Sequence, residues 1–166
     1  MPSSRVLRKR EPSLAMPLDR DSELDELYRE IILDHYRSPR NRGSLAQPSA
    51  SSEGDNPLCG DELRIDLDIR DGRIFDVRFE GKGCSISQAS ASMMTEAIKG
   101  LSLAEVESLF EMFKGMMYGA GEVDVEPLGD LEALQGVRKF PVRVKCATLA
   151  WNTLQEALEE FGKGQG

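Results

Sequence analysis

The chain has 166 residues, 40% of them hydrophobic, so it is long enough to bury a core of its own. A formal net charge of −8 argues against a general affinity for nucleic-acid phosphates. No apolar run approaches the roughly 20 residues that cross a membrane, and three scattered cysteines without a signal peptide do not suit a secreted disulfide scaffold. We therefore expect a cytoplasmic protein whose partners are proteins or metals, with no nucleic acid and no membrane.

The N-terminal region is expected to contain a disordered extension followed by a helix. Residues 1–22 are rich in proline and charge, which predicts disorder, and Met16 is a second possible start. Residues 23–162 are expected to form a single domain. Ser22 opens an S-x-x-D capping pattern, and the helix that follows should end before Pro39. The predicted apolar face of this helix consists of Leu24, Leu27, Tyr28, Ile31 and Ile32.

The middle of the chain predicts a mobile loop and then a β-hairpin. Residues 44–54 are small and polar, and they lead into the motif NPLCGD at residues 56–61. Residues 62–81 alternate apolar and polar side chains on both sides of Asp71-Gly72, a pair that favours a tight turn. This pattern predicts an antiparallel hairpin with one solvated face.

Three more helices are expected in the second half of the chain. The first follows Cys84, the second begins at Ser102 with a capping box to Glu105, and the last begins near Pro141. Residues 119–130 are rich in glycine and acidic side chains and are expected to form a loop.

Each cysteine lies close to a position where a loop is expected to enter a strand or a helix. Cys59 is where a loop enters a strand, Cys84 is where a loop enters a helix, and Cys146 is in about the first turn of the last helix. A helix N-terminus favours thiolate over thiol, so a lowered pKa is expected for Cys84 and Cys146. Three thiolates and the Asp61 carboxylate would complete a tetrahedral zinc site, and Gly60 would permit the sharp turn that this requires.

The same cysteines permit a simpler interpretation. Free cysteines are among the most buried residue types, so all three could be packing residues. Their separations match no local zinc-finger pattern, and spacing therefore does not decide between packing and a site. Glycines and polar residues flank each cysteine, which favours a site. His35, the single histidine, is expected to be structural.

Four motifs occurring in order resemble the IscU and SufU family of iron–sulfur cluster assembly proteins. They are LYREIILDHYRSPRNRG, NPLCGD, GKGCSISQASASMM and KCATLAW, and the resemblance covers about residues 24–161. It implies an α+β fold with a three-stranded antiparallel sheet, helices packed on that sheet and a metal site at one end. The SufU branch is the better match, because Lys145 stands where the scaffold branch usually has a histidine.

The resemblance also implies a site and an activity. The residues that match the family's zinc ligands are Cys59, Asp61, Cys84 and Cys146. Cys59 matches the sulfur acceptor, and Arg143 and Lys145 are expected to support the site by balancing its negative charge. The implied function is zinc-dependent sulfur transfer in iron–sulfur cluster biogenesis, with sulfur taken from a SufS-type cysteine desulfurase and passed to downstream cluster-assembly proteins.

Two other functions remain open at this point. The first is a scaffold on which an iron–sulfur cluster is assembled on the same four ligands and handed on. The second is a structural zinc module that only binds partners. Lys145 favours the sulfur relay over the scaffold.

Overall fold

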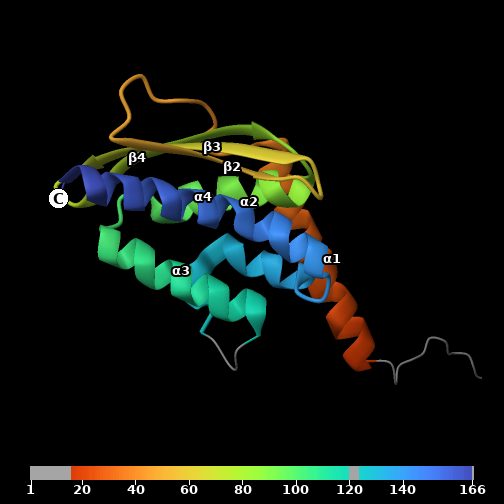
Figure 1. The fold of residues 1–166 in the computed structure, drawn as a ribbon. Helices are drawn as coiled ribbons and strands as arrows, with labels where there is room; N and C mark the ends of the chain where they lie inside the picture. The colour runs from red at the N-terminus through yellow and green to blue at the C-terminus, as the bar shows by residue number, and fades with distance from the viewer. Residues whose placement is uncertain (1–15, 120–123, 166) are drawn as a thin grey trace, which may run out of the picture.

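The structure confirms the α+β fold, with helices covering one face of a small sheet (Figure 1). The computed structural model describes residues 16–119 and 124–165. The helices are α1 (Met16–Arg37), α2 (Ser85–Ile98), α3 (Leu103–Tyr118), the 3-10 helix η3 (Glu126–Val137) and α4 (Pro141–Gln165). The strands are β2 (Ala50–Asn56), β3 (Asp61–Arg70) and β4 (Arg73–Lys82).

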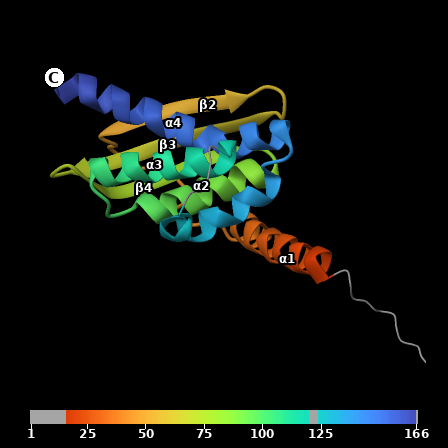
Figure 2. The ribbon, with the colours of Figure 1, turned by 90° about the horizontal axis from the view of Figure 1, so that it is seen from below.

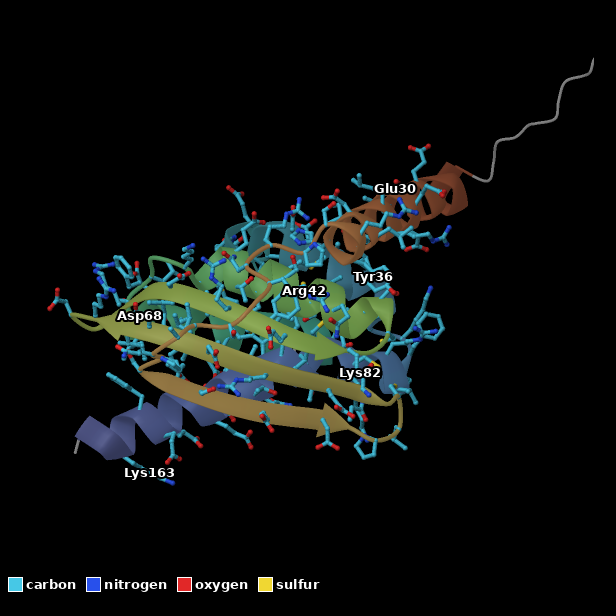
Figure 3. The ribbon with its side chains drawn as sticks, turned by 90° about the horizontal axis from the view of Figure 1, so that it is seen from above. Glu30, Tyr36, Arg42, Asp68, Lys82 and Lys163 are labelled. Atoms are coloured by element: carbon cyan, nitrogen blue, oxygen red, sulfur yellow. The ribbon has the colours of Figure 1, made fainter. Side chains whose placement is uncertain are left out.

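The sheet has β3 at its centre, antiparallel to β2 on one side and to β4 on the other. The predicted hairpin of β3 and β4 is confirmed, with Asp71 at φ 52° and Gly72 at φ 71° in its turn. Asn56 at the end of β2 pairs with Asp61 at the start of β3. The segment with Cys59 therefore joins two paired strands at one end of the sheet, the end at which β4 finishes with Lys82 (Figure 3).

Two layers of helices lie behind the sheet. α4 packs against β2 and β3, α2 packs against β4, and α3 and η3 lie farther from the sheet (Figures 1 and 2). Trp151 of α4 joins the two layers, because its ring stacks on those of Phe110 and Phe113 at centroid distances of 5.3 Å. The sheet fills the core with apolar strand residues, namely Ala50, Leu63, Ile65, Leu67, Ile69, Ile74, Val77 and Phe79.

Helix α1 differs from its prediction at its N-terminal end. It begins at Met16, so the predicted start at Ser22 is wrong, and the described part of the expected disordered extension is helical. Proline is tolerated in a first helical turn, so Pro17 does not prevent this start. Residues 1–15 lie outside the described part of the chain. Leu24 and Leu27, predicted to face the core, are 41% and 54% exposed because this half of α1 projects from the domain (Figure 2).

The three-stranded sheet that the resemblance implies is confirmed, but the local sequence did not locate its first strand, β2. Residues 44–54 were expected to form a mobile loop, but Ala50–Asn56 pairs with β3 along its whole length. Small polar residues are poor strand formers, so this strand depends on its neighbours in the fold. Gly54 is one such position: a Cβ there would overlap Thr153 Oγ1 of α4, so its missing side chain lets the helix lie on the strand.

The second half of the chain follows its prediction more closely. The α3 capping box is present, with Glu105 N–H donating to Ser102 Oγ at 3.1 Å and Ser102 N–H donating to Glu105 Oε1 at 2.8 Å. The expected loop over residues 119–130 is wrong from Glu126, where η3 begins. This short helix forms because buried Leu128 and Leu131 hold it against the core. No helix in the described ranges is long and apolar enough to cross a membrane.

Candidate metal centre

Cys59 lies in the tight turn between β2 and β3. Its N–H donates to Asn56 O at 3.1 Å, and the Asn56 side chain caps the same turn by accepting Leu58 N–H at 3.2 Å. Gly60 has φ 70°, a conformation that favours glycine, and it turns the chain into β3. Cys59 is half-buried and Leu58 is 68% exposed, so the turn offers the thiol to an approaching molecule.

Asp61 connects this turn to the start of α2. Its carboxylate is fully buried, and Oδ1 accepts the N–H of Cys84 at 2.8 Å. Cys84 is the N-cap residue of α2, and its Sγ is 3.9 Å from Asp61 Oδ2. Gly83 makes this approach possible, because a Cβ there would overlap Asp61 Oδ1. The predicted position of Cys84 at the helix entry is confirmed.

Cys146 completes the group from the third side. Its thiol donates to the sulfur of Cys59 at 2.9 Å, and the donor atoms of Cys59, Asp61 and Cys146 all lie within 4.8 Å of one another. Asn56 Nδ2 lies 3.9 Å from Cys146 Sγ. The structure therefore gathers side chains from the turn, from β3 and from α4 at one end of the sheet, with Cys84 beside them.

The environment of Cys146 differs from its prediction. Its position agrees with the prediction, because it is the sixth residue of α4, just beyond the first turn. Burial raises the pKa of the Cys146 thiol well above its usual range, and the hydrogen bond to Cys59 and the nearby Asp61 carboxylate raise it further. Removal from water disfavours the thiolate more than the helix N-terminus favours it.

The four side chains suit zinc in their donor chemistry. Thiolate and carboxylate are both zinc ligands, and structural sites take four in a tetrahedron. Zinc–sulfur bonds of about 2.3 Å set two sulfurs about 3.8 Å apart, so Cys59 and Cys146 would separate slightly around an ion. A buried carboxylate and a buried thiol in contact also lack a positive partner in the described structure, which a divalent cation would supply.

Arg143 and Lys145 were expected to support the site. Both lie in the first two turns of α4 and are exposed. In the described structure neither side chain forms an ion pair or a hydrogen bond with the cysteines or Asp61. Their role in balancing the charge of the site stays a prediction.

Sequence reasoning missed two residues that build the site. Asn56 caps the Cys59 turn and contacts Cys146, and Gly83 lets Cys84 approach Asp61. The Asn-Pro pair at 56–57 is a turn-initiating dipeptide and could have identified the first. The close approach at Gly83 depends on the sheet and is not visible in the sequence.

The chain belongs to a known family. Residues 27–147 match the family described as NifU-like N terminal domain, which confirms the resemblance found in the four motifs. The chain is 49% identical over 144 residues to the Zinc-dependent sulfurtransferase SufU of Bacillus subtilis, covering 86% of this chain and 97% of the relative. It is 42% identical over 137 residues to the Iron-sulfur cluster assembly scaffold protein IscU of Thermotoga maritima, covering 82% and 96%.

Solved structures agree with this assignment. A protein from Fervidobacterium islandicum, described as an iron–sulfur cluster assembly scaffold for the SUF system, superposes with a TM-score of 0.74 at 37% identity, covering 78% of this chain and 94% of that one. The N-terminal part of a NifU-like protein from Brucella abortus superposes with a TM-score of 0.76 at 24% identity, which shows a shared fold.

Proposed function

We propose that this protein is a zinc-dependent sulfurtransferase of iron–sulfur cluster biogenesis, which accepts sulfur on Cys59 from a SufS-type cysteine desulfurase. The observation that supports this most strongly is the contrast between the two cysteines in contact. Cys59 is half-buried in a turn that reaches solvent, whereas Cys146 is buried in α4. A sulfur acceptor must meet its partner's reactive group, which supports Cys59 over Cys146; Cys84 is half-buried as well, but it caps α2 rather than lying in the turn.

The transfer is a thiol–disulfide type of exchange. The Cys59 thiolate attacks the terminal sulfur of the desulfurase persulfide, a new sulfur–sulfur bond forms on Cys59, and the desulfurase cysteine leaves as a thiolate. No net oxidation occurs, because the sulfur–sulfur bond of the desulfurase persulfide breaks as the new one forms, and the transferred sulfur keeps its oxidation state. A second exchange of the same kind would pass the terminal sulfur from Cys59 to a downstream cluster-assembly protein. Reduced thiols are required throughout, which suits the cytoplasm.

Cys59, Asp61, Cys84 and Cys146 are the residues that would hold zinc. Bound zinc would keep the cysteines deprotonated without redox chemistry of its own. The chain's residues supply the rest: Asn56 and Gly60 hold the turn, and Asp61 fixes the start of α2 through Cys84 N–H. Exposed Arg143 and Lys145 would balance the negative charge of the thiolates and attract an anionic persulfide.

A scaffold that assembles an iron–sulfur cluster is the second candidate. Cysteine thiolates hold such clusters as well as zinc, so the donor set alone does not separate the two. The 42% identity to a protein named as an IscU scaffold is the specific observation in its favour. Lys145 in place of a histidine favours the sulfur relay.

The deciding experiment follows sulfur from labelled cysteine onto the chain. The protein is purified without added metal, its metal content is measured, and it is incubated with a SufS-type desulfurase and [35S]cysteine. We expect about one zinc per chain and label retained on the wild type under non-reducing conditions. The Cys59→Ser variant should stay folded by circular dichroism and carry no label.

Two controls make the outcomes distinct. Cys84→Ser removes a sulfur from the group but keeps the Cys59 thiol. The label and the zinc content of this variant are measured together, so that an effect of zinc loss on labelling is distinguished from loss of the acceptor thiol. Labelling of Cys59→Ser at the wild-type level would overturn the relay. Iron with acid-labile sulfide in the purified protein, or a stable coloured cluster in Asp61→Ala, would support the scaffold instead.

A further inference from the structure

A second group of potential metal ligands lies where α1, α2 and η3 meet. It consists of His35 on α1, Glu96 on α2 and Asp130 on η3, and one donor atom from each lies within 4.8 Å of the others. His35 Nε2 is 2.8 Å from Asp130 Oδ2 and 4.0 Å from Glu96 Oε1. None of these residues belongs to the cysteine site, so the group needs an explanation of its own.

The ring of His35 is held in a fixed orientation. It is completely buried, and its Nδ1 is 2.8 Å from Ser92 Oγ, which also accepts the N–H of Arg40 at 2.8 Å. The two lone pairs of the Ser92 hydroxyl allow it to accept both Arg40 N–H and His35 Nδ1–H. Histidines that bind metals usually donate their other ring N–H to such a partner. In the metal-free protein His35 Nε2 is hydrogen-bonded to Asp130 Oδ2 at 2.8 Å, so a bound cation would take the place of the proton between these two atoms.

The two carboxylates reach this nitrogen from the surface. Glu96 and Asp130 side chains are 53% and 51% exposed, so a hydrated ion can approach them. Asp130 is directed to His35 by the break in η3 at Gly129, whose φ of 58° and ψ of −130° are not helical. Glycine tolerates this conformation, so Gly129 allows the chain to turn directly before Asp130.

The charges around His35 do not balance. Arg40 pairs with Asp34 at 2.7 Å, and its Nε is 3.9 Å from Glu96 Oε2. The Arg40 guanidinium acts on Asp34, Glu96 and Asp130, and Arg37 also acts on Asp34, so Glu96 and Asp130 share the Arg40 charge with a third carboxylate. A divalent cation held between the imidazole nitrogen and the two carboxylates would offset this excess of negative charge.

From this geometry we infer that His35 Nε2, Glu96 and Asp130 bind a first-row divalent cation such as Zn²⁺. Nitrogen and carboxylate oxygen bind zinc at about 2.0–2.2 Å, which places neighbouring donors of a tetrahedron about 3.3–3.6 Å apart. The His35 and Asp130 donors, 2.8 Å apart, would separate slightly around an ion, and Glu96 Oε1, 4.0 Å from His35 Nε2, would move closer. Water would complete the coordination. With one imidazole and no thiolate, the site should bind more weakly than the cysteine site.

The test uses the natural chain without a histidine tag, already loaded with zinc at the cysteine site. Zn²⁺ is added and its binding is followed by calorimetry and by a long-range ¹H–¹⁵N spectrum of the imidazole. His35 is the single histidine, so its two ring nitrogens give the only imidazole signals. We expect one further zinc per chain, with a proton on Nδ1 and a zinc-induced shift at Nε2.

Carboxylate variants keep the test independent of folding, since replacing buried His35 could disturb the core. Glu96→Gln and Asp130→Asn should each weaken this second binding at least about tenfold. Glu126→Gln is the matched control, because it removes the same charge from exposed η3 outside the group. No second zinc, an unchanged Nε2 signal on binding, or equal weakening in Glu126→Gln would overturn the inference. The cysteine site stays loaded throughout, so the proposed sulfur transfer is not at issue.

Discussion

Asp61 and Asp66 are buried carboxylates of the same strand, β3, but they have different surroundings. Asp66 lies on the outer face and accepts hydrogen bonds from Ser51 Oγ, Leu45 N–H and Arg64 Nε. Burial alone would raise the pKa of the Asp66 carboxyl, but these hydrogen bonds and the Arg64 charge outweigh it and hold the pKa below its usual value. Asp66 is a fully partnered structural residue.

Asp61 lies at the sheet end and has far fewer partners. One oxygen accepts Cys84 N–H, the other faces Cys84 Sγ at 3.9 Å, and no ion pair with Asp61 occurs in the described ranges. A carboxylate can accept about four hydrogen bonds, so much of its capacity is unused. Both carboxylates are therefore buried. What distinguishes Asp61 from Asp66 is its unused hydrogen-bonding capacity next to other potential metal ligands.

The largest effect is expected from Asp61→Asn. Asparagine can still accept Cys84 N–H, but it removes the negative charge that a metal would require. We expect zinc affinity to fall by more than the roughly 10–100-fold caused by loss of an outer partner, with little change in the metal-free fold. Competition with a chromophoric chelator measures the affinity, and circular dichroism checks the fold.

Asp68→Asn is the matched control for this variant. Asp68 lies in the same strand, is partly exposed and pairs with Arg70 at 3.0 Å. The zinc affinity of the Asp68→Asn variant should equal that of the wild type. Retention of full affinity by Asp61→Asn would show that the cysteines hold the metal without this carboxylate.

Asp66→Asn should show the opposite pattern, with zinc binding kept and stability lost. Breaking a buried, charge-assisted hydrogen-bond group costs about 3 kcal/mol of the free energy of unfolding. The folded-state pKa of Asp66 is lowered, so its contribution is complete above the unfolded value of about 3.9 and is lost as pH falls through the folded value. The destabilisation measured by urea unfolding should therefore shrink in acid. A cost that is equal at pH 7 and pH 3 would contradict this account.

The fold could be predicted where local patterns and tertiary packing agree. The β3–β4 hairpin and the α3 capping box were found because alternation, Asp71-Gly72 and Ser102 act locally. Strand β2 was missed because its small polar residues become a strand only through pairing with β3 and contact with α4. The exposed side of α1 was missed because periodicity shows that a helix has an apolar face but not whether the domain covers it.

The candidate site could be predicted in its residues but not in its contacts. The cysteines and Asp61 were visible because glycines and polar residues flank them and the backbone changes state there. The pKa of Cys146 was predicted in the wrong direction, since the sequence shows its place near a helix start but not its burial. His35 was expected to be structural. The sequence does not show that η3 brings Asp130 to within 2.8 Å of His35 Nε2.

Gln88 offers the finest test of the comparison between Asp61 and Asp66. It lies one helical turn after Cys84, is 3% exposed, and neither its Nε2 nor its Oε1 has a hydrogen-bond partner in the described structure. Like Asp61 it is buried with unmet capacity, but it is neutral and is not part of the ligand group. If unmet capacity matters only beside other ligands, Gln88→Met should raise the free energy of unfolding by about 1 kcal/mol and leave zinc binding and sulfur acceptance unchanged. Gln135→Met is the control and should be destabilising, because Gln135 Nε2 donates to Tyr28 Oη at 2.8 Å. A loss of sulfur acceptance in Gln88→Met would instead give the buried amide a place in the site.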